Sequence, residues 1–525
     1  MVDVKNGGTD HVEDIAVEAQ VATTDEHLLT VREAFRRYPK AVFWSAIMSM
    51  TIIMEGYDMS LMGNFFTYPT FERKYGTYSP EHGYIISTPW QTGLSLGAVV
   101  GAFFSLLVNG QLTERFGHRY VLMVALVAMS AIVFMQFFAP SIEVLQAAQV
   151  LVGLPWGIFA VMGPSYASEV CPLALRGYLT AYVNLCWVIG QLIGGGVLQG
   201  LVNNTTEWSY RIPFAIQWIW PLPLFLLTFF APDSPYWLVR KGRMVDAERS
   251  IKRLSSNLTE EQVRNSLALI DHTNRLEQSL RSESSYWDCF RSTNLRRSEI
   301  ACMALCAQCT SGQVFAYSPT YFLIQAGVNT SNAYQINFGS IACAFVCTCI
   351  SWLLMTYIGR RALFIWGMSV MTVVLLVIGT LAFSTSDNAK WAQGGLSVVW
   401  LALYSATLGP QSFTIAAEIS ATRVRAQTIS LARNAYYLVS IVANVIEPQL
   451  INPTAANLKG KTAFFWMATS LVTVIWAIFR LPESRGRTYE ELDLLFEKRL
   501  PAWKFSSADM DAIRRANEEV TEKAV

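Results

Sequence analysis

The chain has 525 residues, a formal net charge of +1, and a composition that is 52% hydrophobic and only 15% charged. Soluble domains carry roughly 25% charged residues, so this composition indicates a membrane protein. The balanced charge offers no basic surface for nucleic acid, and we exclude nucleic-acid binding.

The first 40 residues, 1–40, are polar and mix acidic with basic side chains. They contain no apolar run followed by a small-residue cleavage site, so we expect no cleaved signal peptide. We interpret this segment as a cytoplasmic tail and expect the first apolar stretch to anchor the chain in the membrane.

Twelve apolar stretches follow, and each has the length of about 18 residues or more that a helix needs to cross a bilayer. They cover 41–63, 84–108, 119–138, 144–164, 178–202, 212–230, 299–325, 333–358, 362–383, 391–417, 427–450 and 462–480. The sequence therefore predicts an all-α membrane protein with twelve transmembrane helices in two six-helix halves, 41–230 and 298–480.

Basic residues predict the orientation of these helices. Twelve Lys and Arg lie in the central loop, 231–297, and more lie in the short loops after the second, fourth, eighth and tenth stretches. Cytoplasmic loops are enriched in Lys and Arg, so we expect this loop and both termini, including the tail 481–525, in the cytoplasm. The central loop has no Gly-rich phosphate loop, which excludes an ATP-driven pump.

Three short phrases occur once in each half, about 250 residues apart. They are Glu-x6-Arg at 169–176 and 418–425, a Pro-acid-Ser helix exit at 232–235 and 482–485, and a basic turn around glycine at 114–119 and 356–361. Such matched marks indicate a duplicated membrane bundle. That architecture belongs to transporters whose substrate sits between the two halves.

Charged residues of these phrases lie at predicted cytoplasmic helix ends. The set comprises Glu114, Arg115, Arg119, Glu169, Arg176, Glu418 and Arg425. We expect them to form ion pairs that hold an inner gate shut and that bias the rocking of the two halves. The alternative is that they only set the topology, as positive charges on the cytoplasmic side.

Further phrases narrow the interpretation. They are Glu55-Gly-Tyr-Asp58, Pro155-Trp-Gly157, Ser165 through Arg176, Asn184-Leu-Cys-Trp187, Leu431-Ala-Arg-Asn434, and a tail that runs from Pro482-Glu-Ser-Arg to Trp503-Lys-Phe505. Together they resemble the sugar porter branch of the major facilitator superfamily over about residues 40–500, a branch whose members carry their substrate between two six-helix halves. Within that branch they look like the fungal maltose and α-glucoside permeases, which are proton symporters of the plasma membrane.

Two carboxylates in the first apolar stretch are candidates for proton coupling, because an acid inside the hydrocarbon layer is costly and rarely idle. They are Glu55 and Asp58. The resemblance implies that the acid of the Gly-Tyr-Asp phrase, Asp58, binds the proton. The alternative is an interfacial acid at a helix end.

One position departs from the pattern of this branch. Proton-coupled sugar porters commonly pair the coupling acid with an arginine in helix 4, whereas this chain has Gln149 there. A neutral amide hydrogen-bonds a carboxyl without supplying charge. Arg433 in the eleventh stretch is another candidate partner, and the alternative is that Arg433 reaches the cytoplasmic interface.

Sugar hydroxyls need groups that donate and accept hydrogen bonds, together with apolar faces for the ring. The candidates on the expected cavity helices are Asn184, Gln191, Gln308, Gln313, Asn337, Phe413, Asn434 and Tyr436. The resemblance implies that the amides of the fifth and seventh helices contact sugar, and that Phe413 stands where monosaccharide porters usually have tryptophan. The alternative for each single amide is that it joins two helices.

The combined prediction is a secondary active transporter that imports an α-glucoside such as maltose by proton symport, through alternating access. The alternatives are a symporter for a monosaccharide or another oligosaccharide, and a sugar sensor that does not transport. We expect a multi-pass protein of the plasma membrane that functions as a monomer, with the sugar, the proton and the lipid bilayer as partners. No nucleophile–base set or metal cluster is evident, so we expect no enzyme activity, no cofactor and no metal.

Overall fold

The computed structural model describes residues 29–80, 83–256, 258–281, 286–316, 320, 323–324, 327–384, 386–420, 424–452, 455–485, 492 and 495–505. Within these residues the chain is almost entirely helical. Its two strands, β1 (Thr77–Ser79) and β2 (Gly83–Ile85), form one antiparallel hairpin in which Tyr78 faces Tyr84.

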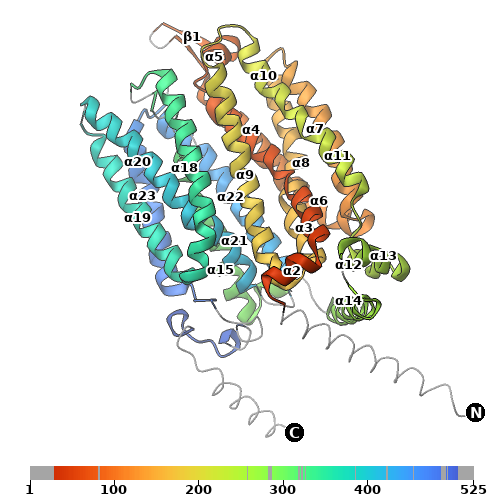
Figure 1. The fold of residues 1–525 in the computed structure, drawn as a ribbon. Helices are drawn as coiled ribbons and strands as arrows, with labels where there is room; N and C mark the ends of the chain where they lie inside the picture. Colours follow the sequence, from red (N-terminus) through yellow and green to blue (C-terminus); the bar gives the residue numbers. More distant parts are fainter. Residues whose placement is uncertain are drawn as a thin grey trace, which may run out of the picture. The chain divides into compact units, whose positions relative to one another are not determined.

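The chain divides into two compact units. Figure 1 shows its helices in colours that follow the sequence. Unit 1 comprises Met1–Glu283, Tyr317–Val346 and Asn444–Lys459, and unit 2 comprises Ser284–Ala316, Cys347–Ala443 and Gly460–Val525. Two long helices, α18 (Thr330–Tyr357) and α22 (Arg425–Ile451), contribute residues to both units. Unit 1 therefore combines the first half of the sequence with parts of the second.

The remaining helices of unit 1 follow in chain order. They are α2 (Val31–Arg37), α3 (Pro39–Ser49), α4 (Ile52–Phe65), α5 (Pro69–Tyr75), α6 (Thr88–Phe116), α7 (His118–Phe137), α8 (Ile142–Val170), α9 (Leu173–Leu201), α10 (Trp208–Ile216), η1 (Gln217–Ile219), α11 (Pro221–Phe230), α12 (Pro235–Arg240), α13 (Met244–Leu254) and α14 (Glu260–Arg281). Helix α4 packs along α9, and α6 packs along α8.

Unit 2 is built from η2 (Tyr286–Phe290), α15 (Ser292–Thr310), α16 (Gln313–Ala316), α19 (Arg360–Leu381), α20 (Asp387–Ala406), α21 (Leu408–Ile419), α23 (Thr462–Arg480) and η5 (Ala502–Lys504). A further short 3-10 turn, η4 (Lys459–Lys461), lies at the boundary of the two units. In unit 2, α19 packs on α23 and on α20, and α15 packs on α21.

Nine helices in the described part of the chain are long and apolar enough to cross a membrane. The predicted spans at 41–63, 299–325 and 391–417 are not among the nine, and each is divided between two helices in the described residues: α3 and α4, α15 and α16, and α20 and α21. The sixth predicted span is also interrupted, by η1 between α10 and α11, but it is one of the nine. The total of twelve spans stays a prediction.

Hydroxyl side chains that bond to the backbone flank the first break, at Met50 and Thr51. Ser49 Oγ donates to the carbonyl of Ser45 at 2.9 Å, and Thr51 Oγ1 donates to the carbonyl of Met48 at 2.8 Å. Such bonds compete with the helical hydrogen bonds and bend helices. The break leaves the acids of the first span in a helix of their own, α4.

The other two breaks lie at unusual backbone conformations. Gly312, between α15 and α16, has a φ of 91°, which glycine adopts without steric cost. Thr407, between α20 and α21, has a φ of −123° and a ψ of −82°. Apolar composition predicted spans here, but composition alone does not reveal an interruption of one or two residues.

Glycine allows two of the long helices of unit 1 to touch. A Cβ atom on Gly153 of α8 would lie 2.1 Å from the carbonyl oxygen of Ala98 in α6 and 2.7 Å from the Cα of Gly101. Small residues at helix contacts let membrane helices pack backbone to backbone. This contact fixes α8, which carries several of the candidate functional residues.

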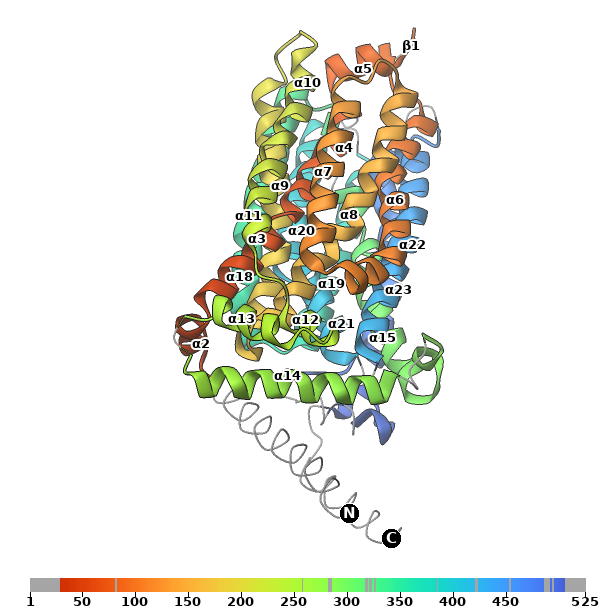
Figure 2. The same ribbon diagram turned by 90° about the vertical axis from the view of Figure 1, so that its right-hand side faces the viewer.

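Most of the central loop of the sequence, 231–297, is helical, and its part up to Glu283 belongs to unit 1. Figure 2 shows α12, α13 and α14 gathered at one end of the long helices of that unit. Their apolar faces form a small core that includes Trp237, Ala247, Ile251 and Val263. Some of their basic residues are exposed, such as Arg249, which pairs with Asp246.

Candidate functional site

Asp58 lies in α4 and is completely buried, with 0% of its surface exposed. One oxygen, Oδ1, accepts hydrogen bonds from Gln217 Nε2 at 2.8 Å and from Gln136 Nε2 at 3.4 Å. Gln149 of α8 lies beside the same carboxyl without making a hydrogen bond of normal geometry. The carboxyl is thus surrounded by neutral amides from η1, α7 and α8.

The sequence predicted that Gln149 lies near Asp58, but it did not identify Gln136 and Gln217. Gln136 and Gln217 are each an amide within an apolar stretch, which marks them as unusual in the sequence. The sequence does not show which helix they face, because they are 78 and 159 residues from Asp58. Glu55, the second predicted acid, is also buried in α4, with 9% of its surface exposed.

Three predicted sugar-binding residues belong to unit 1. Asn184 and Gln191 both lie in α9, Asn184 half-buried and Gln191 buried to 4% exposure. Seven residues on an α-helix make two turns, so both face the same side of α9. Asn337 of α18 is also buried, and its amide donates to Asn64 Oδ1 at 3.2 Å.

Asn64 is the centre of that last cluster. Its Oδ1 also accepts from Thr320 Oγ1 at 2.5 Å, and its backbone carbonyl accepts from the Tyr334 hydroxyl at 2.6 Å. The cluster links the end of α4 to α18 and is buried throughout. Asn337 is therefore engaged in a bond between helices, which was the alternative for each predicted amide.

The other predicted sugar-binding residues belong to unit 2. Gln308 of α15 donates to the carbonyl of Gly409 at 3.1 Å, and Gln313 of α16 is buried beside the break at Gly312. Asn434 Oδ1 in α22 is buried and has no hydrogen-bond partner among the described residues. An unsatisfied buried acceptor of this kind is a natural contact for a sugar hydroxyl.

Arg433 lies among aromatic rings. Its guanidinium carbon is 5.3 Å from the ring centroid of Phe413, 5.1 Å from that of Tyr436 and 5.3 Å from that of Tyr437. Phe413 and Tyr436, both predicted to contact sugar, are thus brought together with this arginine. Contacts between a cation and aromatic faces stabilise a buried charge by about 0.5–2 kcal/mol each.

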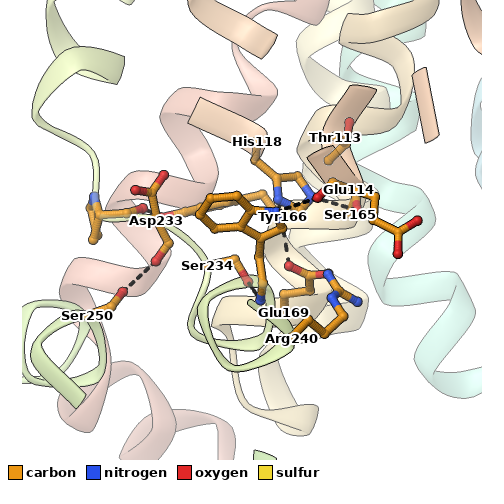
Figure 3. A network of polar contacts seen from close by, with 12 residues as sticks. Thr113, Glu114, His118, Ser165, Tyr166, Glu169, Asp233, Ser234, Arg240 and Ser250 are labelled. Atoms are coloured by element: carbon orange, nitrogen blue, oxygen red, sulfur yellow. Dashed lines mark hydrogen bonds and ion pairs between the residues drawn. The ribbon is translucent and has the colours of Figure 1, made fainter. Parts of the chain in front are cut away.

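A polar network at the ends of α7, α8 and α12 contains several of the predicted gating residues (Figure 3). Glu169 Oε1 pairs with Arg240 Nη2 at 2.8 Å, and Glu169 Oε2 lies 3.7 Å from His118 Nδ1. His118 Nε2 lies 3.1 Å from Ser165 Oγ. Burial raises the pKa of Glu169, but the facing His118 and Arg240 outweigh it and hold the pKa below its ordinary value.

The basic turn at 114–119 contacts this network through its backbone and through Arg119. The backbone carbonyl of Glu114 accepts from Trp237 Nε1 at 3.0 Å. Arg115 lies over Phe116, and Arg119 lies over Phe229 at 5.2 Å. Burial also raises the pKa of Asp233, which Arg119 offsets only in part.

Unit 2 contains a corresponding network around Glu418. Its Oε1 pairs with Arg360 Nη2 at 3.0 Å, and its Oε2 accepts from Ser484 Oγ at 2.6 Å. The carboxyl of Glu483 caps the start of α19 by accepting from the backbone N–H groups of Arg360 and Arg361. The side chains of Arg176 and Arg425, the predicted partners of the two glutamates, lie outside the described residues.

Comparisons with known proteins agree with this fold. Residues 44–496 match the family described as "Sugar (and other) transporter". The chain is 38% identical to a maltose permease of Saccharomyces cerevisiae, over 98% of this chain and 85% of the permease. It is 36% identical to a general alpha-glucoside permease of the same yeast, over 94% of this chain and 81% of that permease.

Solved structures resemble it at lower identity. The proton:xylose symporter XylE bound to 6-bromo-6-deoxy-D-glucose has a TM-score of 0.71 at 18% identity, and the similarity covers 87% of this chain and all of that one. A partially occluded inward-open form of XylE from E. coli has a TM-score of 0.69 at 16% identity, over 85% of this chain and 99% of that one. The predicted all-α membrane fold is confirmed, and the chain belongs to the sugar transporter family of the major facilitator superfamily.

Proposed function

We propose that this protein imports an α-glucoside such as maltose by proton symport, through alternating access. The observation that carries the coupling is the fully buried carboxyl of Asp58, held by amides in the middle of unit 1. An acid in that position gains or loses a proton only when the pathway opens to water. The names of the two yeast permeases support the class of substrate.

A monosaccharide or another oligosaccharide is the second candidate substrate. Phe413 favours a disaccharide or longer sugar over a monosaccharide, because it is smaller than the tryptophan of monosaccharide porters. Its ring and that of Tyr436 both lie beside the Arg433 guanidinium. The contacts we assign to the sugar are Asn184, Gln191, Gln308, Gln313, Asn434 and Tyr436, with Asn337 contributing through the Asn64 cluster. A sensor that binds sugar without transport is the remaining alternative.

The two glutamate networks support an inner gate. Glu169 ties the end of α8 to α7 and α12, and Glu418 ties the end of α21 to α19. We assign both networks to the cytoplasmic side, since the positive-inside rule places their loops there. Each network lies within one unit, so its role is to hold helix ends in register while the halves rock.

The same rule puts both termini in the cytoplasm. The plasma membrane is the proposed location of this multi-pass protein, and a monomer is the proposed functional form. Sugar and proton would then enter together from outside the cell.

Uptake in cells that lack their own sugar transporters tests this proposal. Radiolabelled maltose, trehalose, sucrose, lactose and glucose are supplied separately while the external pH is recorded. The proposal predicts saturable maltose uptake with a rise in external pH. Uptake of glucose alone would select the second candidate, and binding without uptake would select the sensor.

A further inference from the structure

Four buried polar side chains from four elements of unit 1 meet around one carboxyl. They are Asp58 of α4, Gln136 of α7, Gln149 of α8 and Gln217 of η1, and none exposes more than 1% of its surface. We name this set the amide cage. Burying so many polar groups in one place costs free energy unless each finds a partner.

One oxygen of the acid is satisfied by the cage. Asp58 Oδ1 accepts from Gln217 Nε2 and from Gln136 Nε2, at 2.8 Å and 3.4 Å. Both N–H groups stabilise a negative charge on the carboxyl, because a hydrogen bond to the ionised form favours that form. The shorter bond makes Gln217 the stronger of the two.

The other side of the cage is rich in acceptors that lack a partner. Among the described residues, Asp58 Oδ2 and the Oε1 atoms of Gln136, Gln149 and Gln217 make no hydrogen bond, and neither does the one unsatisfied donor of the cage, Gln149 Nε2. A proton on Asp58 Oδ2 would turn that oxygen into a donor, and an amide oxygen beside it would become its acceptor. One proton therefore satisfies two orphaned atoms at once.

Among the described residues, no hydrogen bond or ion pair joins a cation to the acid. Tyr57 is the neighbouring titratable group, and its hydroxyl is engaged with the carbonyl of Pro213 at 2.8 Å. Glu55 lies three residues earlier on α4. Arg211 of α10 is paired with Glu207 at 2.9 Å and lies over Phe137.

The cations and acids of the packed helices lie at their ends. Arg119 is the second residue of α7, roughly 25 Å along the helix from Gln136. In α8, Glu143 and Glu169 lie at opposite ends, and in α9 the basic residue is Arg176, near the start. Gln217 and Gln136 donate hydrogen bonds to the carboxyl, and Gln149 lies beside it.

We propose that the amide cage is a proton site without a counter-cation. Gln217 and Gln136 are positioning residues that hold the ionised acid, and Gln149 accepts a hydrogen bond from the protonated, neutral acid. An amide carries both a donor and an acceptor, so the same three side chains serve both protonation states. The proton binds Asp58 Oδ2 from outside water and leaves to inside water, and no other bond changes. This inference rests on the proposed proton symport.

Three variants test the cage through the external pH at which sugar uptake falls by half. Uptake falls on the alkaline side when Asp58 loses its proton too readily to be loaded. Gln217→Leu removes the stronger donor to the anion, so the fall moves to higher pH by about one unit. Gln136→Leu gives a smaller shift in the same direction, and Gln149→Arg adds a cation and moves the fall to lower pH.

Shifts of the half-maximal pH in opposite directions at neighbouring positions distinguish this role from a structural one. A variant that only destabilises the protein lowers uptake at every pH and does not shift the half-maximal pH in a particular direction. Gln91→Leu is the matched control, because Gln91 is buried in α6 but donates to the carbonyl of Ile86 outside the cage. Amounts at the membrane are measured for every variant. If Gln149→Arg does not reach the membrane, the order of Gln217→Leu and Gln136→Leu still decides.

Unchanged pH profiles for Gln217→Leu and Gln136→Leu would overturn the cage, as would a shift of Gln149→Arg in the same direction as theirs. Uptake that follows external sodium at constant pH, with a half-saturating sodium concentration altered in the cage variants, would also overturn it in favour of a metal cation. Wild-type uptake without any proton entry would instead refute the proposed symport itself.

Discussion

Asp58 combines complete burial with hydrogen-bond partners that carry no charge, and we propose it as the residue on which coupling depends. Asp58→Asn keeps the shape of the side chain and removes its proton chemistry. We expect this variant to lose accumulation against a gradient while it retains exchange of sugar down a gradient. Sugar-induced alkalinisation of the medium is the measurement, and an undiminished signal would remove Asp58 from the mechanism.

Gln191 is the residue that tests the sugar site most simply. It is buried in α9 and faces the same side of that helix as Asn184. Replacing it with alanine leaves a sugar hydroxyl without a partner, which costs about 1–3 kcal/mol. Gln191→Ala should raise the half-saturating sugar concentration roughly 5- to 100-fold with normal amounts at the membrane. An unchanged half-saturating concentration would return Gln191 to the amides that join helices.

At this scale the sequence identified the acid but only part of its surroundings. A carboxyl in an apolar stretch is visible in any sequence because it is costly there. Gln136 and Gln217 were missed since their contact with Asp58 depends on how α7, η1 and α4 face each other. The partners of Asn337 and Arg433 were missed for the same reason.

At the scale of elements, Arg240 of α12 replaces the expected arginine as the described partner of Glu169. Removing it leaves a carboxylate of low exposure without its arginine partner, beside His118 and Ser234. A charged hydrogen bond is worth about 1.5–3 kcal/mol, enough to shift a two-state equilibrium roughly tenfold or more. We expect Arg240→Ala to reduce net uptake and to leave sugar binding intact, in transport and binding assays on the same membranes.

Arg249→Ala is the control for that variant, because Arg249 is an exposed partner of Asp246 on the neighbouring helix α13. Exposed pairs are worth under about 1 kcal/mol, so this variant should transport normally. If Arg240→Ala also transports at the wild-type rate, the glutamate network sets topology only.

The glycine contact between α6 and α8 gives a prediction about stability. Gly153→Ala would force a methyl group against the Ala98 carbonyl, whereas Gly200→Ala in α9 meets no atom within 4 Å. Overpacking of this kind costs about 1–3 kcal/mol. Thermal unfolding in detergent should therefore occur at a lower temperature for Gly153→Ala and be unchanged or raised for Gly200→Ala. Equal melting temperatures in the two variants would contradict the close packing.

The elements themselves were largely predictable, because membrane spans need long apolar stretches. Composition alone does not reveal their interruptions. The breaks at Thr51, Gly312 and Thr407 involve single residues, two of which have unusual dihedral angles. Hydropathy averages over many residues and hides them.

At the scale of the whole molecule, the duplicated phrases predicted matching networks in the two halves. The described structure has one around Glu169 and one around Glu418, each within its own unit. They differ in their basic partners: His118 of unit 1 stands where the repeat has Arg360 in unit 2, and Glu169 takes its arginine partner from α12. The sequence could not show that unit 1 also takes in residues 317–346 and 444–459, since that depends on packing between distant segments.

The central claim is that the sugar moves inward together with a proton. Purified protein in liposomes, with an inward proton gradient imposed across the membrane, tests it most directly. We predict that maltose accumulates inside above its external concentration, and that a proton ionophore abolishes the accumulation but not equilibration. Accumulation that persists with the ionophore, or maltose that only equilibrates under the gradient, would contradict proton-coupled import.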